Sequence, residues 1–174
     1  MKSVAAPAAA KFSFAPVADA RTRLLILGSL PGEISLAQAQ YYANPRNQFW
    51  RLMETVTGAH LEAASYAERL ETLLEAGVGL WDVIKSGERA GSLDTSIRNH
   101  QANALGEFAA GLPELRAIAF NGGKASAIGR RQLAAELPYA LLTLPSSSPA
   151  HAVPFEAKLA AWRGLTLYLD PAVG

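Results

Sequence analysis

Four short stretches of the chain are apolar at most consecutive positions rather than at alternate ones. They are residues 23–28, 117–120, 139–144 and 165–169. Continuous apolar runs of this length are typical of strands that are buried on both faces of a parallel sheet. The pattern therefore predicts four parallel strands.

Helical patterns lie between these runs, each after a polar residue or a proline. They cover residues 45–57, 66–75, 103–110, 123–136 and 154–162. Strands that alternate with helices predict an α/β fold, a three-layer sandwich in which a central four-stranded parallel sheet is flanked by helices. The length of 174 residues fits one domain, which we place at residues 12–174 after a flexible N-terminal tail of residues 1–11.

Ligands of parallel α/β sheets bind outside the carboxyl ends of the strands, so the segments that follow the apolar runs are the candidate functional segments. Residues 28–32, Gly-Ser-Leu-Pro-Gly, form a small-residue loop whose amides can approach a phosphate or a base, with a simple tight turn as the alternative. Residues 145–149, Pro-Ser-Ser-Ser-Pro, form a rigid loop rich in hydroxyl groups, which suits the binding of a phosphodiester.

Two asparagines near these segments carry candidate chemistry. Asn121 precedes two glycines, and its amide suits either the reading of an extruded base or the capping of the next helix. Asn44 before Pro45 predicts a helix N-cap with proline at the first helical position. Asn47 then lies in the first turn, where it either points toward the sheet edge or helps to cap the helix.

Composition narrows the chemistry further. The chain has no cysteine, which excludes disulfides, thiolate nucleophiles and iron–sulfur clusters held by thiolates. The net charge is only +1, yet residues 54–75 hold five acids and one base, so the remainder carries +5. This asymmetry fits either a basic surface turned toward an anion or an acidic face that is merely solvated. No apolar run approaches the roughly 18 residues of a membrane span, so we expect a soluble, cytoplasmic protein.

The order and spacing of five segments resemble the uracil-DNA glycosylase superfamily. The segments are residues 28–32, residues 41–50, residues 80–83 with 91–94, residues 120–122 and residues 144–149. The chain is most similar to the hypoxanthine-DNA glycosylase branch, also called DNA-deoxyinosine glycosylases, and the resemblance covers residues 12–169. It implies the same four-stranded α/β sandwich that the apolar pattern predicts.

The resemblance also implies roles for individual residues. Asn47 is expected to position or polarise the attacking water, Phe49 to stack on the flipped base, and Asn121 to hydrogen-bond the edge of that base. Either of two adjacent tyrosines is expected to shape the pocket wall, and five further residues to bind the flanking DNA phosphates. The tyrosines are Tyr41 and Tyr42, and the five residues are Ser29, Gly32, Ser146, Ser147 and Ser148.

Two positions depart from the pattern of the uracil enzymes. Leu30 stands where those relatives place the polar residue that positions water, and Leu144 stands where they place His or Asn. A leucine neither orients water nor stabilises a leaving anion, so both positions favour the hypoxanthine branch. The residue that fills the space left by the flipped base is not evident, because Ser148 and its neighbours occupy the position of the bulky residue used by relatives.

We therefore predict a monofunctional DNA glycosylase that hydrolyses the N-glycosidic bond of deoxyinosine and leaves an abasic site. The alternatives are a uracil or G:U/T mismatch glycosylase and a non-catalytic module that binds damaged DNA. The expected partner is damaged double-stranded or single-stranded DNA, through which the cytoplasmic protein would be associated with the nucleoid. No cofactor, metal, membrane or obligate protein partner is expected, and the expected state is a monomer.

Overall fold

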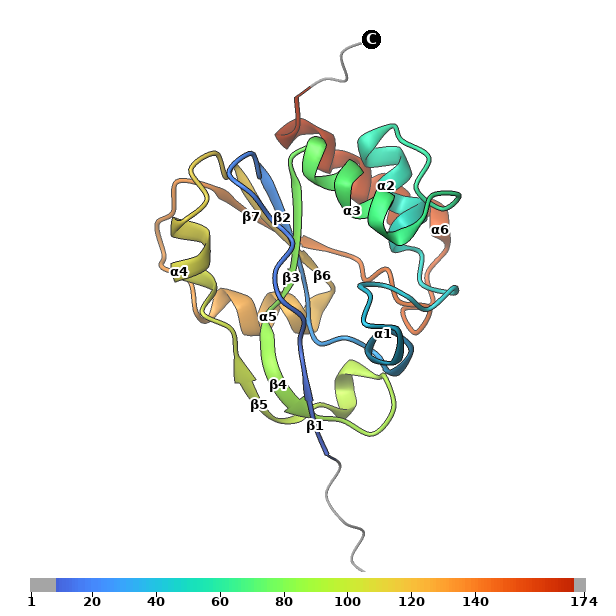
Figure 1. Ribbon diagram of the computed structural model, residues 1–174. Helices are drawn as coiled ribbons and strands as arrows, with labels where there is room; N and C mark the ends of the chain where they lie inside the picture. The colour runs from blue at the N-terminus through green and yellow to red at the C-terminus, as the bar shows by residue number, and fades with distance from the viewer. Residues whose placement is uncertain (1–8, 171–174) are drawn as a thin grey trace, which may run out of the picture.

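The computed structural model describes residues 9–170, and its centre is a parallel four-stranded sheet in the order β3-β2-β6-β7 (Figure 1). The strands are β2 Leu24–Gly28, β3 Val78–Asp82, β6 Ala117–Asn121 and β7 Ala140–Leu144. Every residue of the two central strands, β2 and β6, is buried, as their continuous apolar sequences predict. The predicted α/β sandwich is confirmed.

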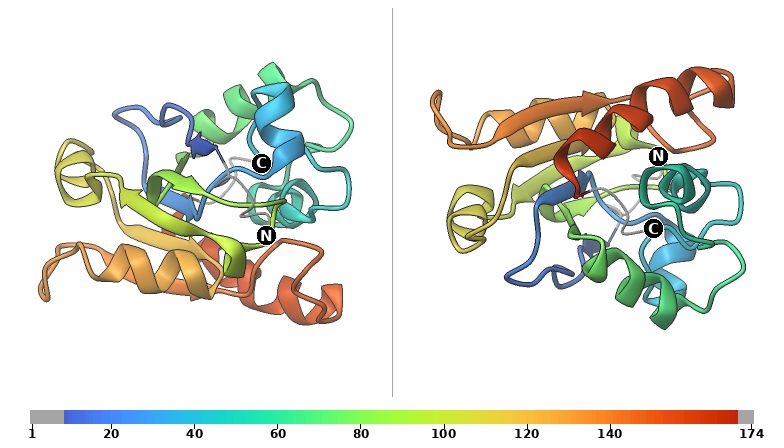
Figure 2. Two further views of the ribbon diagram at one scale, coloured as in Figure 1. Left: turned by 90° about the horizontal axis from the view of Figure 1, so that it is seen from below. Right: turned by 90° about the horizontal axis from the view of Figure 1, so that it is seen from above.

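Helices cover both faces of this sheet, which makes three layers (Figure 2). One apolar core joins Leu24 and Ile26 of β2 to α2, α3 and α6, and the other joins Leu25 and Leu27 to α4 and α5. The bounds are α2 Phe49–Thr57, α3 Tyr66–Glu75, α4 Leu105–Ala110, α5 Gly123–Arg130 and α6 Phe155–Arg163. Alternate residues of β2 thus pack into two separate cores, one on each face of the sheet.

A second, antiparallel sheet in the order β1-β4-β5 flanks the first and has no counterpart in the sequence-based prediction (Figure 1). Its strands are β1 Ala10–Phe12, β4 Ile84–Glu88 and β5 Arg98–Ala102. All five residues of β5 are exposed, so no apolar alternation marks it. Because β1 pairs with β4, the predicted tail of residues 1–11 extends too far; its residues 1–8 lie outside the described part of the chain.

The prediction of a strand at residues 165–169 is wrong. Residues Gly164–Tyr168 form the 3₁₀ helix η2, which continues directly from α6. Leu165 is buried whereas Leu167 is 82% exposed, so the apolar run that resembles a buried strand buries only one side of a short helix.

The fourth strand of the sheet is β3, whose sequence, Val-Gly-Leu-Trp-Asp, is interrupted by a glycine. That glycine, Gly79, allows the N-terminal segment to approach, since an added Cβ would lie 3.0 Å from the Val17 carbonyl oxygen. The feature that broke the apolar pattern therefore has a packing reason.

Two helix boundaries differ from the prediction by four residues or more. The helix expected from Pro45 begins only at Phe49, because the Asn44 side chain closes a turn by accepting a hydrogen bond from the Arg46 N–H at 2.9 Å. The helix expected to reach residue 136 ends at Arg130. The boundaries of α3 are as predicted, and a capping box between Ser65 and Glu68 fixes its start.

Two further short elements border the functional region: α1 Glu33–Gln38 and the 3₁₀ helix η1 Asp94–Ser96. None of the helices in residues 9–170 combines the length and apolar character needed to cross a bilayer.

Candidate active site

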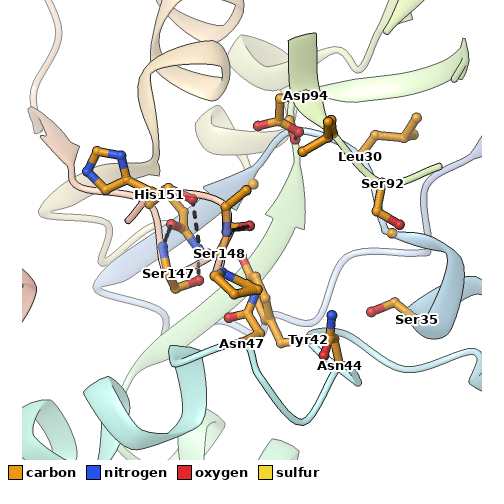
Figure 3. A pocket seen from close by; sticks show the side chains of 18 of the residues that line it. Leu30, Ser35, Tyr42, Asn44, Asn47, Ser92, Asp94, Ser147, Ser148 and His151 are labelled. Atoms are coloured by element: carbon orange, nitrogen blue, oxygen red, sulfur yellow. Dashed lines mark hydrogen bonds between the residues drawn. The ribbon is translucent and has the colours of Figure 1, made fainter. Parts of the chain in front are cut away.

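A cavity of about 620 Å³ opens at the carboxyl edge of the parallel sheet (Figure 3). This volume lies within the range of roughly 300–1,000 Å³ that is usual for small-molecule sites. Strands β2, β3 and β6 end at this cavity, and the loop after β7 borders it, as expected for a ligand site of an α/β sheet. Eight of the ten predicted site residues line it: Ser29, Gly32, Tyr42, Asn47, Asn121, Ser146, Ser147 and Ser148.

The other two predicted site residues are Tyr41 and Phe49, and both are buried away from the cavity. Tyr41 is 4% exposed and donates a hydrogen bond from its hydroxyl to the Ala15 carbonyl at 2.8 Å. Phe49 is fully buried between Tyr42, stacked at 3.9 Å between ring centroids, and Trp162. Tyr42 is therefore the aromatic ring of the cavity wall, and Phe49 supports it from behind.

Tyr42 is held in an unusual conformation. Its φ of 53° lies in the left-handed region, which costs a non-glycine residue on the order of 1 kcal/mol or more. The surrounding side chains fix this conformation, since Trp50 Nε1 donates to the Tyr42 carbonyl at 3.1 Å and Ser35 Oγ accepts from the Ala43 N–H at 3.1 Å. Such maintained strain is typical of functional segments.

Asn47 lies in the turn before α2 and not in the first helical turn. Its Oδ1 accepts a hydrogen bond from the Phe49 N–H at 3.0 Å, which leaves the amide nitrogen as the group that can meet a ligand. The next residue, Gln48, donates its backbone N–H to the Ser147 carbonyl at 3.0 Å. The turn is thus tied to the serine loop, residues 145–151 after β7.

Asn121 is 7% exposed and organises the serine loop. Its Nδ2 donates to Ser147 Oγ at 2.9 Å and to Tyr42 Oη at 3.2 Å, while its Oδ1 accepts from the Ser147 N–H at 2.9 Å. The amide does not cap α5, whose N-cap is Gly122. Both of its donor hydrogens are committed within the protein, so a ligand can reach only one remaining lone pair of Oδ1.

The four serines differ in what they can offer a ligand. Ser29 donates its hydroxyl to Asp94 at 2.6 Å, and Ser147 is 1% exposed, so neither hydroxyl is free for a phosphate. Ser146 and Ser148 accept through Oγ from the N–H groups of Ser148 and Ala150, at 3.1 and 3.2 Å. Their hydroxyl hydrogens remain available as donors.

Asp82, the last residue of β3, is a cavity residue to which sequence reasoning assigned no role. It is 4% exposed, and its Oδ2 is buried without a hydrogen-bond partner among residues 9–170. Burial raises the pKa of this carboxyl to about 7, with a further increase from the negative charge of Asp94 and a partial decrease from Arg89. Its position at the end of a buried strand is the sequence signal that could have identified it. Because β3 was not predicted as a strand, that signal was not recognised.

Gly28 makes room for this carboxyl. A Cβ at Gly28 would lie 2.7 Å from Asp82 Oδ1 and 3.1 Å from Tyr42 Oη, so only glycine fits between the two groups. The first glycine of the predicted loop therefore brings an acid and a phenol to the same point on the cavity floor.

A buried arginine braces the cavity from beneath. The Arg89 guanidinium, 2% exposed, donates to the carbonyl oxygens of Leu30, Pro31 and Gly91 and lies 3.6 Å from Asp94. These bonds fix the loop after β2 against the segment that follows β4. No lysine or arginine lines the cavity in the described part of the chain, so the cavity itself is neutral to acidic.

Comparison with known proteins identifies the family of this chain. The sequence model of the uracil DNA glycosylase superfamily matches residues 15–166. The chain belongs to the uracil DNA glycosylase superfamily. Within it, the chain is 38% identical over 152 residues to the Hypoxanthine DNA glycosylase of Methanosarcina barkeri, covering 87% of this chain and 95% of that protein.

A protein sequence and a solved structure from Methanosarcina acetivorans support the same placement. A Hypoxanthine DNA glycosylase is 42% identical over 141 residues, covering 81% of this chain and 88% of that protein. A solution NMR structure of a candidate uracil DNA glycosylase superposes with a TM-score of 0.81 at 37% identity, covering 91% of this chain and 97% of that one. The chain therefore matches these relatives over most of their length and shares the fold of the solved structure.

The two departures from the uracil enzymes differ in where they lie. Leu30 lines the cavity and is 6% exposed, so an apolar side chain occupies part of its wall. Leu144 is buried in the core beside α6 and does not line the cavity. Among residues 9–170, no group of three or more His, Asp or Glu side chains is placed to hold a metal ion.

Proposed function

We propose that this protein hydrolyses the N-glycosidic bond of deoxyinosine in DNA, releasing hypoxanthine and leaving an abasic site. The observation that carries the proposal is a neutral-to-acidic cavity at the superfamily's sheet edge, in which the amide nitrogen of Asn47 and the buried carboxyl of Asp82 are available to a base. The names of the two Methanosarcina relatives favour hypoxanthine. Damaged DNA is the partner, bound by a monomer in the cytoplasm.

The reaction needs a water molecule, a stabilised cation and a leaving base. Water attacks C1′ of the deoxyribose, the bond from C1′ to N9 breaks, and its electron pair leaves with the purine, which takes up a proton. The sugar passes through a cationic state that the DNA phosphates stabilise. Asn47 positions the water through its amide nitrogen, because its Oδ1 is already bonded to Phe49.

Asp82 is proposed to bind the leaving base. Hypoxanthine presents a ring N–H donor beside a carbonyl acceptor, and a protonated carboxyl offers the complementary pair, an acceptor oxygen and an O–H donor. Donation to the purine carbonyl stabilises negative charge that develops as the base departs.

The other cavity residues hold the nucleotide in place. The outer face of Tyr42 is the surface on which the base stacks, with Phe49 behind it. Asn121 keeps Tyr42 and Ser147 in register, and Ser146 and Ser148 donate to the flanking phosphates together with the Gly32 amide. Phosphates are thus bound by neutral donors.

Release of the free base tests the proposal. A duplex with one hypoxanthine is incubated with excess protein, free hypoxanthine is measured by chromatography, and the strand is assayed for alkali-labile breaks. We expect equal amounts of free base and abasic site. Binding of the duplex without base release would instead identify a non-catalytic module. Release of uracil from a matched uracil duplex, without release of hypoxanthine, would identify a uracil or mismatch glycosylase.

A further inference from the structure

Extrusion of a base leaves a gap in the DNA stack, and base-flipping proteins fill such gaps with an apolar side chain. The serine loop supplies no large apolar side chain at the cavity, because Ser148, Pro149 and Ala150 follow one another there and the larger side chain beyond them, His151, is polar. A residue from another segment of the cavity rim must therefore do this if the proposed function is correct.

Five large apolar side chains are exposed among residues 9–170. They are Phe12, Ile34, Leu93, Val153 and Leu167. Only two of them, Ile34 and Leu93, line the cavity. Leu93 is the more exposed of the two, at 53% against 40% for Ile34.

Leu93 is presented by a braced segment between β4 and β5. On one side of it, Ser92 Oγ accepts a hydrogen bond from the Glu33 N–H at 3.0 Å. On the other side, Asp94 accepts from Ser29 at 2.6 Å and pairs with the buried Arg89. Both neighbours of Leu93 are thus tied to the loop after β2, and its side chain is held outward at a fixed place.

The position suits insertion beside a flipped nucleotide. Figure 3 shows Ser92, which precedes Leu93, across the cavity from His151 in the serine loop, and Asp94, which follows Leu93, at the top of the view between them. A strand whose phosphates bind the serine loop would therefore meet Leu93 across the cavity mouth. We propose that Leu93 enters the DNA stack in place of the extruded hypoxanthine.

Insertion matters for a base that must leave a duplex and not for a base that is already unstacked. Leu93→Ala is therefore compared with the unchanged protein in single-turnover release of hypoxanthine from duplex and from single-stranded DNA. We expect at least about a tenfold loss on the duplex, with the single-strand rate within about twofold. Leu93→Met should restore most of the duplex rate, and Leu167→Ala, which truncates an exposed leucine away from the cavity, should change neither rate.

A second readout does not depend on cleavage. 2-Aminopurine placed beside hypoxanthine in a duplex reports unstacking by fluorescence, and we expect the rise on binding to be lost in Leu93→Ala. Equal losses on both substrates, an unchanged duplex rate, or a duplex-specific loss in Ile34→Ala alone would overturn the proposal. Absence of hypoxanthine release by the unchanged protein, with the fluorescence rise intact, would contradict the proposed function instead.

Discussion

Asp82 is the residue whose chemistry depends most on its surroundings. An aspartate at this position is an acceptor when ionised, and it becomes both donor and acceptor only because burial raises its pKa to about 7. The proposed contact with the lactam of hypoxanthine requires the protonated form. The rate of base release should therefore depend on pH through this one carboxyl.

The first prediction concerns that pH dependence. The single-turnover rate of the unchanged protein should fall as pH rises above about 7, where Asp82 loses its proton. In Asp82→Asn the side chain keeps a donor and an acceptor at every pH, so this fall should disappear, while Asp82→Ala should be at least about tenfold slower throughout. His151→Gln removes the imidazole from the cavity rim and serves as the control. The same fall in Asp82→Asn would contradict the role of Asp82.

The second prediction concerns Asn47. Asn47→Ala should lower the single-turnover rate at least about tenfold, the scale of one lost transition-state hydrogen bond of roughly 1.4 kcal/mol or more. It also removes the hydrogen bond to the Phe49 N–H, so the free energy of unfolding is measured in parallel. Ser65→Ala removes a comparable cap from α3, away from the cavity, and should lower stability without lowering the rate. An unchanged rate in Asn47→Ala would remove this residue from the mechanism.

At the scale of elements, two of the strands that carry the site could be predicted from the sequence. These are the strands whose residues are apolar because every position is buried. Both central strands, β2 and β6, are apolar at almost every position, and this pattern has no competing cause. Strand β3 was missed because close approach of Val17 requires Gly79, which interrupts the apolar run. With β3 missed, Asp82 had no strand end to mark it, so the most buried acid of the site went unassigned.

The turn at residues 44–48 could not be predicted from local sequence. A proline after an asparagine predicts a helix start, and local signals contain nothing to the contrary. The helix begins later because Asn44 closes a turn and Gln48 bonds to Ser147, which is about a hundred residues away in sequence. A contact of that range is fixed by the tertiary fold and leaves no local pattern.

The third prediction concerns the meeting of β2 and β3. Gly28→Ala places a Cβ against Asp82 and Tyr42, so we expect a loss of about 1–3 kcal/mol in the free energy of unfolding and at least a tenfold slower release of hypoxanthine. Gly123→Ala is the matched control, since its added Cβ meets nothing within 4 Å and it lies at the start of α5 on the same sheet edge. A fully active Gly28→Ala protein would show that the Asp82 carboxyl is not confined.

At the scale of the whole molecule, the fourth prediction links Asp82 to folding. Its pKa is about 7 in the folded protein against an ordinary value of 3.8, so between these pH values the folded state binds more protons than the unfolded state. The free energy of unfolding should therefore fall as pH rises through this window, by up to about 1.4 kcal/mol per pH unit from this group. Asp82→Asn removes that contribution, so denaturant titrations should show its stability rising relative to the unchanged protein up to pH 7 and then levelling.

The low net charge of the chain agrees with the residues that line the cavity. A net charge of +1 gives little indication of DNA binding, and the cavity itself contains no lysine or arginine among the described residues. Hydroxyl and amide donors at Ser146, Ser148 and Gly32 suit a nucleotide that is held by geometry more than by charge. We therefore expect recognition to be concentrated in the flipped base.

Selectivity among bases tests this account most directly. Duplexes with hypoxanthine, uracil, xanthine or thymine opposite each natural base are treated with excess protein, and strand breaks are quantified after alkali over time. The cavity, with Leu30 in its wall and Asp82 on its floor, predicts that hypoxanthine is released fastest. Faster release of uracil than of hypoxanthine would contradict it.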